Sequence, residues 1–107
     1  MLIYNKLVRD RIPEIIEGTG KRSSTKTLSK SEFIKELRRK SFEELEEYMN
    51  ADNHEEALEE LADLLEIIHA LAETHGASIE KVEELRKQKA EERGGFKEKI
   101  LLIDVED

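Results

Sequence analysis

Two pairs of acidic residues, each spaced three apart, lie in the middle of the chain: Glu44 with Glu47, and Glu60 with Asp63. Residues three apart are neighbours on a helix surface, so each pair could point two carboxylates at one place. Four carboxylates between two packed helices would repel strongly unless a cation neutralised them. Because oxygen-only ligands suit Mg²⁺ or Mn²⁺, the pattern indicates a candidate metal site.

Acidic residues are so frequent in this chain that the spacing has little weight by itself. Asp and Glu make up 26 of the 107 residues, and the same spacing recurs at Glu14/Glu17, Glu43/Glu46, Glu56/Glu59 and Glu80/Glu83. Charged side chains are mostly exposed in folded proteins. A solvated acidic groove is therefore the alternative, and the helix faces must decide between the two.

Residues 40–73 are typical of two helices joined by a short turn at 50–53. Asn53 is the expected N-cap of the second helix, with Glu56 three residues later, as in a capping box. Such a hairpin would bring the two acidic pairs, one on each helix, to a common side.

The first of these helices has a stripe of residues at three- and four-residue spacing that should be buried. Its members are Ile34, Leu37, Ser41, Glu44 and Tyr48. Glu44 thus falls on the stripe and Glu47 at its edge, whereas Glu43 and Glu46 are expected to face water.

The second helix has a broader apolar arc, formed by Leu61, Leu64, Leu65, Ile68, Leu71 and Ala72. Glu60 falls inside this arc and Asp63 at its margin. Carboxylates are rarely buried unless they are paired or bound to a cation. The placement on two facing helices therefore favours a metal site more than the spacing does.

Two further segments are expected before the hairpin. Asp10 is expected to cap a short helix with Pro13 in its first turn, ending at 18–20. A polar segment, which is either a loop or a short exposed strand, follows at 21–27. Ser29, with Glu32 three residues later, should open the long first hairpin helix, which runs to about residue 50.

After the hairpin, the second helix should run over 54–75 with Gly76 just beyond its end. Ser78 is expected to cap a third long helix over 79–93, which has a narrow apolar stripe and therefore packs on one side. The apolar stretch 96–105 is either a short strand that pairs with residues 2–4 or a tail packed on a partner subunit.

The length of 107 residues predicts one domain over 1–107. Without cysteine there are no disulfides or zinc–thiolate sites. The start lacks the apolar run of a signal peptide and no stretch resembles a membrane span, so a cytoplasmic protein with no membrane partner is expected. The net charge of −8 argues against nucleic-acid binding. The wide apolar arc predicts a homodimer or a dimer of dimers.

Basic residues cluster near both ends of this acidic chain. Lys6, Arg9 and Arg11 form one group, and Lys89 and Arg93 lie one turn apart on the third long helix. Each group could be an exposed patch paired with nearby acids. Alternatively, if both groups meet the acidic hairpin, they could bind an anionic substrate.

The acidic pattern, Glu44-x-x-Glu47 followed by Glu60-x-x-Asp63, resembles the signature of the all-α nucleoside triphosphate pyrophosphohydrolases. This superfamily includes the MazG proteins, the dimeric dUTPases and the phosphoribosyl-ATP pyrophosphohydrolases. The start, YNKLVRDRIP (4–13), and the stretch KAEERGGF (89–96) resemble a short branch described as phosphoribosyl-ATP pyrophosphohydrolase-like. The resemblance extends over nearly the whole chain.

The resemblance implies an all-α, MazG-like helical bundle that cleaves a nucleoside triphosphate between its α- and β-phosphates, in house-cleaning of (d)NTPs. Mg²⁺, or Mn²⁺ in its place, would be held by Glu44, Glu47, Glu60 and Asp63, with Glu47 as the expected general base. The substrate's phosphates would be bound by Lys6, Arg9, Arg11, Lys89 and Arg93. A non-catalytic helical module of the same fold that binds a partner remains the alternative.

Overall fold

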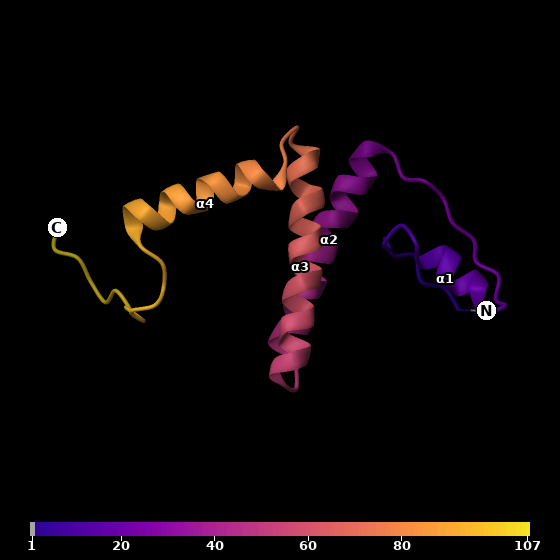
Figure 1. Ribbon diagram of the computed structural model, residues 1–107, viewed down its shortest axis with the longest axis horizontal. Coiled ribbons are helices and arrows are strands. Elements are labelled where there is room, and N and C mark those ends of the chain that lie inside the picture. The colour runs from indigo at the N-terminus through magenta and orange to yellow at the C-terminus, as the bar shows by residue number, and fades with distance from the viewer. Residues whose placement is uncertain (1) are drawn as a thin grey trace.

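The computed structural model describes residues 2–107, and the regular secondary structure over this range is all helical. The helices are α1 (Ile12–Gly18), α2 (Lys30–Met49), α3 (His54–Thr74) and α4 (Ile79–Arg93). No strand forms within residues 2–107, so the all-α class is confirmed and the strand expected as one alternative for 96–105 is not found. Residues 2–4 and 96–105 lie at opposite ends of the molecule, too far apart to pair within one chain (Figure 1).

Side-chain caps explain where the two hairpin helices begin. Ser29 and Glu32 form the expected capping box at the start of α2. At the start of α3, the Asn53 side chain accepts a hydrogen bond from the Glu56 N–H at 2.8 Å. The Glu56 carboxylate, however, accepts from the N–H of Asp52 at 3.1 Å. Of the two bonds in the predicted capping box, the one to the Asn53 side chain is therefore formed, and the one from the Asn53 N–H to Glu56 is replaced by the bond from Asp52.

The end of α3 also matches the sequence. Gly76 follows the last turn with φ of +73°, a conformation that glycine adopts without a steric penalty. The N–H of Gly76 donates to the Glu73 carbonyl at 3.0 Å, and the N–H of Ala77 donates to the Ala72 carbonyl at 3.2 Å. These two bonds form a Schellman motif, which stops the helix and redirects the chain into α4.

The caps of the other two helices differ from the prediction. The N-cap of α1 is Arg11 rather than Asp10, although Pro13 does lie in the first turn as expected. Ser78 is the N-cap of α4, but its side chain accepts no capping hydrogen bond. Both helices therefore begin without the side-chain bond that stabilises α2 and α3.

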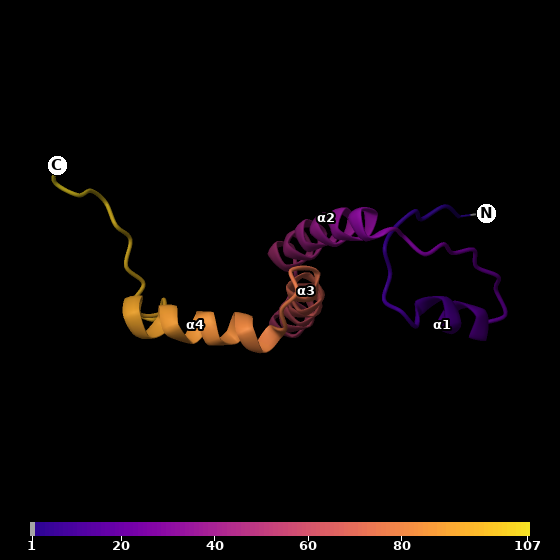
Figure 2. The ribbon, with the colours of Figure 1, turned by 90° about the horizontal axis from the view of Figure 1, so that it is seen from above.

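The α2–α3 hairpin is the centre of the molecule. The two helices lie side by side along most of their length, with the connecting turn at one end (Figures 1 and 2). Among the described residues the buried apolar core consists of Leu37 of α2 with Ile67 and Ala72 of α3. Glu44 is buried beside them, as its place on the predicted stripe requires.

The remaining elements extend away from this hairpin. α4 contacts α3 only, and α1 contacts no other helix of the described chain. The radius of gyration is 18.4 Å, whereas a compact chain of this length has about 13 Å. Val82 and Leu85 of α4 are 37% and 46% exposed, so the middle of the narrow apolar stripe predicted for this helix is largely uncovered within one chain. No helix within residues 2–107 is long and apolar enough to cross a membrane.

Candidate metal centre

Three of the four predicted carboxylates converge where α2 and α3 face each other. Glu44 and Glu47 of α2 and Glu60 of α3 each place a carboxylate oxygen within 4.8 Å of the other two. The helical spacing explains this, since Glu44 and Glu47 are neighbours on one helix and Glu60 lies on the facing stripe of the other. The hairpin therefore brings together acids that are up to 16 residues apart in the chain.

Two of these carboxylates, those of Glu44 and Glu60, lie in surroundings that disfavour their charged forms. Glu44 is 7% exposed, and burial, followed by the charge of Glu47, raises the pKa of Glu44. Proton sharing with the Glu47 carboxyl, followed by burial and the Glu44 carboxyl, raises the pKa of Glu60 to about 7. The Lys40 ammonium lies 3.7 Å from the Glu44 carboxylate and compensates only part of this local negative charge.

The donor atoms of this cluster fit a divalent cation. Oε2 of Glu44 and Oε2 of Glu60 are both buried and have no hydrogen-bond partner among the described residues. Buried acceptors without partners are rare because they lose their hydration without replacement. A hard cation such as Mg²⁺ or Mn²⁺ would satisfy these oxygens and relieve the repulsion between the carboxylates.

The fourth predicted ligand, Asp63, is not part of the cluster. Its carboxylate accepts a hydrogen bond from the Arg9 guanidinium at 2.7 Å, and both side chains are about half exposed. Asp63 nevertheless lies close enough to add to the repulsion that raises the pKa of Glu44. It is therefore next to the three clustered glutamates, with Arg9 as its counter-ion.

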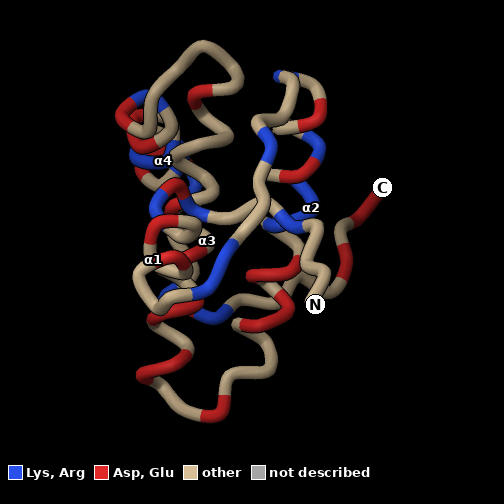
Figure 3. The backbone as a smooth tube through the Cα atoms, turned by 90° about the vertical axis from the view of Figure 1, so that its right-hand side faces the viewer, with Lys and Arg blue, Asp and Glu red and all other residues tan. Residues whose placement is uncertain are grey.

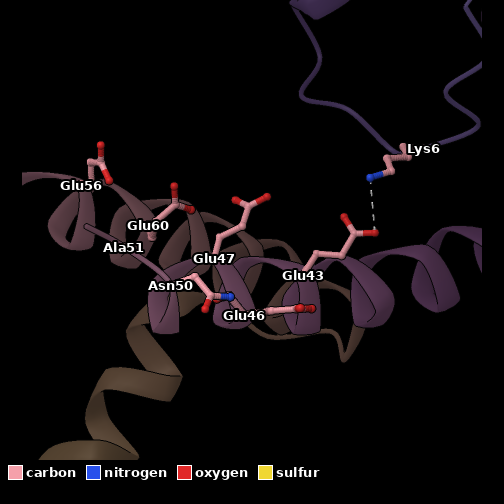
Figure 4. Close-up of a pocket in the computed structure, with 8 residues that line it drawn as sticks. All are labelled: Lys6, Glu43, Glu46, Glu47, Asn50, Ala51, Glu56 and Glu60. Carbon is pink, nitrogen blue, oxygen red and sulfur yellow. Dashed lines mark hydrogen bonds and ion pairs between the residues drawn. The ribbon is translucent and has the colours of Figure 1, made fainter. Parts of the chain in front are cut away.

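An open groove of about 450 Å³ lies beside the cluster and is shown in Figure 4. Five of its eight lining residues are glutamates; the full set is Lys6, Glu43, Glu46, Glu47, Asn50, Ala51, Glu56 and Glu60. Two members of the metal cluster, Glu47 and Glu60, thus also line the groove. A molecule bound in this groove would contact the candidate metal site directly.

The groove is also lined by two glutamates, Glu43 and Glu46, that the helix pattern places outside the site. Glu43 was predicted to face water, but it is half-buried and its carboxylate lies 3.8 Å from the Lys6 ammonium. Glu46, also predicted to face water, is exposed but lines the groove. The sequence spacing could have identified two of the lining residues. Glu43 precedes Glu47 by four residues, and Glu56 precedes Glu60 by four, so each lies one helical turn from a glutamate of the cluster.

The predicted basic residues separate into two sets. Lys6 and Arg9 contact the acidic hairpin, through Glu43 and Asp63 respectively. Arg11 instead pairs with Glu14, three residues along in its own segment, at 3.3 Å. Figure 3, in which the N-terminal side faces the viewer, shows basic positions in blue among the acidic positions in red.

Lys89 and Arg93 do not reach the site within this chain. Both lie in the last two turns of α4, which runs away from the hairpin (Figure 2). One chain therefore brings together three carboxylates, a fourth nearby, and two of the five predicted cations.

A comparison with curated proteins finds a relative in Mycolicibacterium smegmatis, described as an uncharacterized protein. It is 44% identical to this chain over 54 residues, which is 50% of this chain and 55% of the relative. The chain thus matches about half the length of this curated relative. No protein-family model matches the chain, and no solved structure matches it.

Proposed function

We propose that this protein is a Mg²⁺-dependent nucleoside triphosphate pyrophosphohydrolase that acts in the cytoplasm on (d)NTPs as a house-cleaning enzyme. It would cleave the bond between the α- and β-phosphates to give a nucleoside monophosphate and pyrophosphate. The observation that carries the proposal is the cluster of Glu44, Glu47 and Glu60, with two buried, unpartnered oxygens beside an open groove. The resemblance of the two helix motifs and both end segments to the MazG-like proteins supports the same activity.

The residues of the site would have two kinds of role, since some would bind the metal ion and others would act on the substrate. Glu44 and Glu60 would hold Mg²⁺ through their unpartnered oxygens, together with Glu47. Mg²⁺ would neutralise phosphate oxygens and activate the attacking water. Glu47 is the most exposed of the three and lines the groove. We therefore assign it the role of general base, which accepts a proton from the attacking water.

Cations at the groove would attract the triphosphate to an acidic protein. Lys6 and Arg9 are exposed and already lie beside the acidic hairpin, within reach of a phosphate chain in the groove. Asp63 would become a fourth metal ligand if Arg9 turned from it to a phosphate. Since Lys89 and Arg93 lie far along α4, they would act on a bound nucleotide only in the site of a second subunit.

The test is pyrophosphate release from a panel of standard and modified (d)NTPs, with Mg²⁺ and with EDTA. We expect release with Mg²⁺ only, and a loss of at least about a hundredfold in kcat/KM for Glu60→Gln. Glu59→Gln is the matched control, because Glu59 is the exposed neighbour on α3 and lies outside the groove. Equal activity of the two variants, or release that persists in EDTA, would refute the assignment.

The alternative is a non-catalytic helical module that binds a partner through the same fold. The large exposed apolar surface of α2, α3 and the C-terminal segment favours it. The same panel separates the two functions, because a binding module would release no pyrophosphate from any nucleotide. Mg²⁺ would still raise its thermal midpoint if the glutamates hold metal for structural reasons.

A further inference from the structure

The hairpin has an apolar side that nothing within residues 2–107 covers. On α2, Phe42, Leu45 and Met49 follow three- and four-residue spacing, and on α3 so do Leu58, Leu61 and Leu65. These six side chains are 42–73% exposed. Exposed large apolar residues are normal one at a time, but six of them in two stripes on one hairpin are more typical of an interaction surface.

This apolar side lies opposite the candidate metal centre. Leu45 follows Glu44 and Leu61 follows Glu60, so each leucine is turned about 100° from the facing stripe, in the same rotational sense. Because the two helices run in opposite directions and face each other, this rotation brings both leucines to the same side of the hairpin. Glu47 and Asp63 are turned about 60° in the opposite sense, which places them on the other side. A partner could therefore cover the apolar side without blocking the groove.

The C-terminal segment 96–105 is the second uncovered apolar surface. Its apolar residues are Phe96, Ile100, Leu101, Leu102, Ile103 and Val105, and they are 73–98% exposed. The segment leaves the far end of α4 in an extended form, away from the hairpin (Figures 1 and 2). α4 and this segment together form an arm that meets its own hairpin only where α4 contacts α3, and the apolar residues of the segment itself remain exposed.

The amount of exposed surface requires a partner of substantial size. The chain exposes 10166 Å², whereas a compact monomer of 12.4 kDa exposes about 6,100 Å². The excess is about 4,000 Å² per chain, or about 8,000 Å² for two copies, which is more than enough to form an obligate subunit interface. A short peptide or small ligand would cover only a small part of this excess, whereas a second copy of the same chain would cover much of it.

We propose that the segment 96–105 of a second copy lies on the apolar side of the hairpin, and that the two copies exchange these arms reciprocally. Reach argues against the chain's own segment. α4 has 15 residues and is about 22 Å long, so residues 96–102, at about 3.3 Å each, would be used merely to return along it. The apolar stretch 100–103 would then lie beside α4 rather than on the hairpin.

Charge also matches between the two surfaces. The apolar stripe of α2 continues one turn before Phe42 to Arg38, which is exposed and makes no ion pair within residues 2–107. The C-terminal segment is followed by Glu106 and Asp107, after Asp104 within it. A segment lying along the stripe could place these acids beside Arg38 of the copy that it covers.

The absence of cysteine allows a direct test by disulfide cross-linking. One copy receives Ile103→Cys in the segment, and a second, larger tagged copy receives Leu61→Cys on the hairpin. The two are co-expressed and oxidised, and the products are separated by mass. We expect a covalent dimer that contains both chains. Pairing Ile103→Cys with Glu59→Cys, on α3 but off the apolar side, is the matched control and should cross-link at least about tenfold less.

A second cross-linking experiment distinguishes the proposed arrangement from two other possible occupants of the apolar side, namely the chain's own segment and a different protein. In a single chain that carries both Ile103→Cys and Leu61→Cys, reciprocal exchange predicts linked dimers. Oxidised chains that stay monomeric, with an internal disulfide, would mean that the segment covers its own hairpin. A 12.4 kDa monomer by sedimentation of the parent, with no cross-link in either arrangement, would leave the face to a different protein. Either result would overturn the proposal, and neither depends on whether the protein hydrolyses nucleotides.

Discussion

Glu44 shows how a single position combines a structural cost with a candidate function. It occupies a place on α2 where an apolar residue would pack against α3, and one of its oxygens has no hydrogen-bond partner in the described chain. Such a residue destabilises a fold unless something binds it. The clustering of Glu47 and Glu60 at the same point makes a cation the simplest compensation.

The raised pKa of Glu60 predicts how the stability of the metal-free protein depends on pH. An unfolded Glu ionises near 4.5, whereas the pKa of Glu60 in the fold is about 7, so the folded state binds more protons between these values. The stabilisation is present below about pH 4.5 and is lost as the pH rises through about 7. In EDTA, we expect the parent's thermal midpoint to fall over this window relative to that of Glu60→Gln, as calorimetry would show.

The difference between parent and variant isolates Glu60 from other titrating groups. Glu59→Gln should keep the parent's pH profile, because Glu59 lies outside the cluster. If Glu60→Gln and the parent lose stability in parallel between about pH 5 and 8, the pKa of Glu60 is not raised in the fold.

The ion pair between Arg9 and Asp63 predicts competition with metal. If Asp63 serves as a fourth ligand of Mg²⁺, the Arg9 guanidinium on its carboxylate competes with the metal. Exposed ion pairs contribute up to about 1 kcal/mol, which corresponds to about a fivefold change in affinity. We expect Arg9→Ala to bind Mg²⁺ about two- to fivefold more tightly by titration calorimetry, while kcat/KM for the best nucleotide falls.

Arg11→Ala is the control for this effect, because Arg11 pairs with Glu14 of its own segment rather than with the hairpin. It should leave the Mg²⁺ affinity at the parent value. Arg9→Ala with unchanged or weaker Mg²⁺ binding would show that Asp63 takes no part in holding the metal.

At the scale of the elements, the caps determine how firmly the hairpin holds its carboxylates. Asn53 begins α3, the helix that carries Glu60, and its side chain accepts a bond that the helix backbone would otherwise leave unmade. Asn53→Ala should therefore lower the free energy of unfolding by about 1 kcal/mol. Chemical denaturation monitored by circular dichroism would measure the change.

Ser78 provides the comparison, since it occupies the same position on α4 but makes no side-chain capping bond. Ser78→Ala should cost less than about half as much as Asn53→Ala. Equal costs at the two sites would mean that the Asn53 bond contributes little to the stability of α3, and that the hairpin depends on packing alone.

At the scale of the whole molecule, the exposed apolar surface predicts stability that depends on concentration. Only three apolar side chains of residues 2–107 are buried within one chain, too few to offset the entropy of ordering four helices. If folding and dimerisation are linked, the thermal midpoint rises with protein concentration. We expect an increase of several degrees between about 1 and 100 µM, measured by scanning fluorimetry.

A midpoint that is constant over this range would indicate a stable folded monomer and contradict the linkage. Arg39→Ala serves as the control, because Arg39 pairs with Glu36 on its own helix and is off the apolar stripe. It should keep the parent's dependence on concentration, whereas Leu61→Asp, on the stripe, should lower the midpoint at every concentration.

The sequence by itself determined the local features of this protein. The bounds of α2, α3 and α4, the cap at Ser29, the stop at Gly76 and the burial of Glu44 all follow from patterns within about one or two turns. These features are local because a helix repeats every 3.6 residues and its ends are closed by neighbouring side chains. The predicted all-α class follows from the same patterns.

Only the tertiary structure decided which charged groups meet. Asp63 has the same spacing from Glu60 as Glu47 has from Glu44, yet it pairs with Arg9 from a segment 54 residues away. Glu43 faces Lys6 rather than water, and Lys89 and Arg93 are directed away from the hairpin. These outcomes depend on how the connecting segments run in space. That path is set by long-range packing, which helical periodicity alone does not encode.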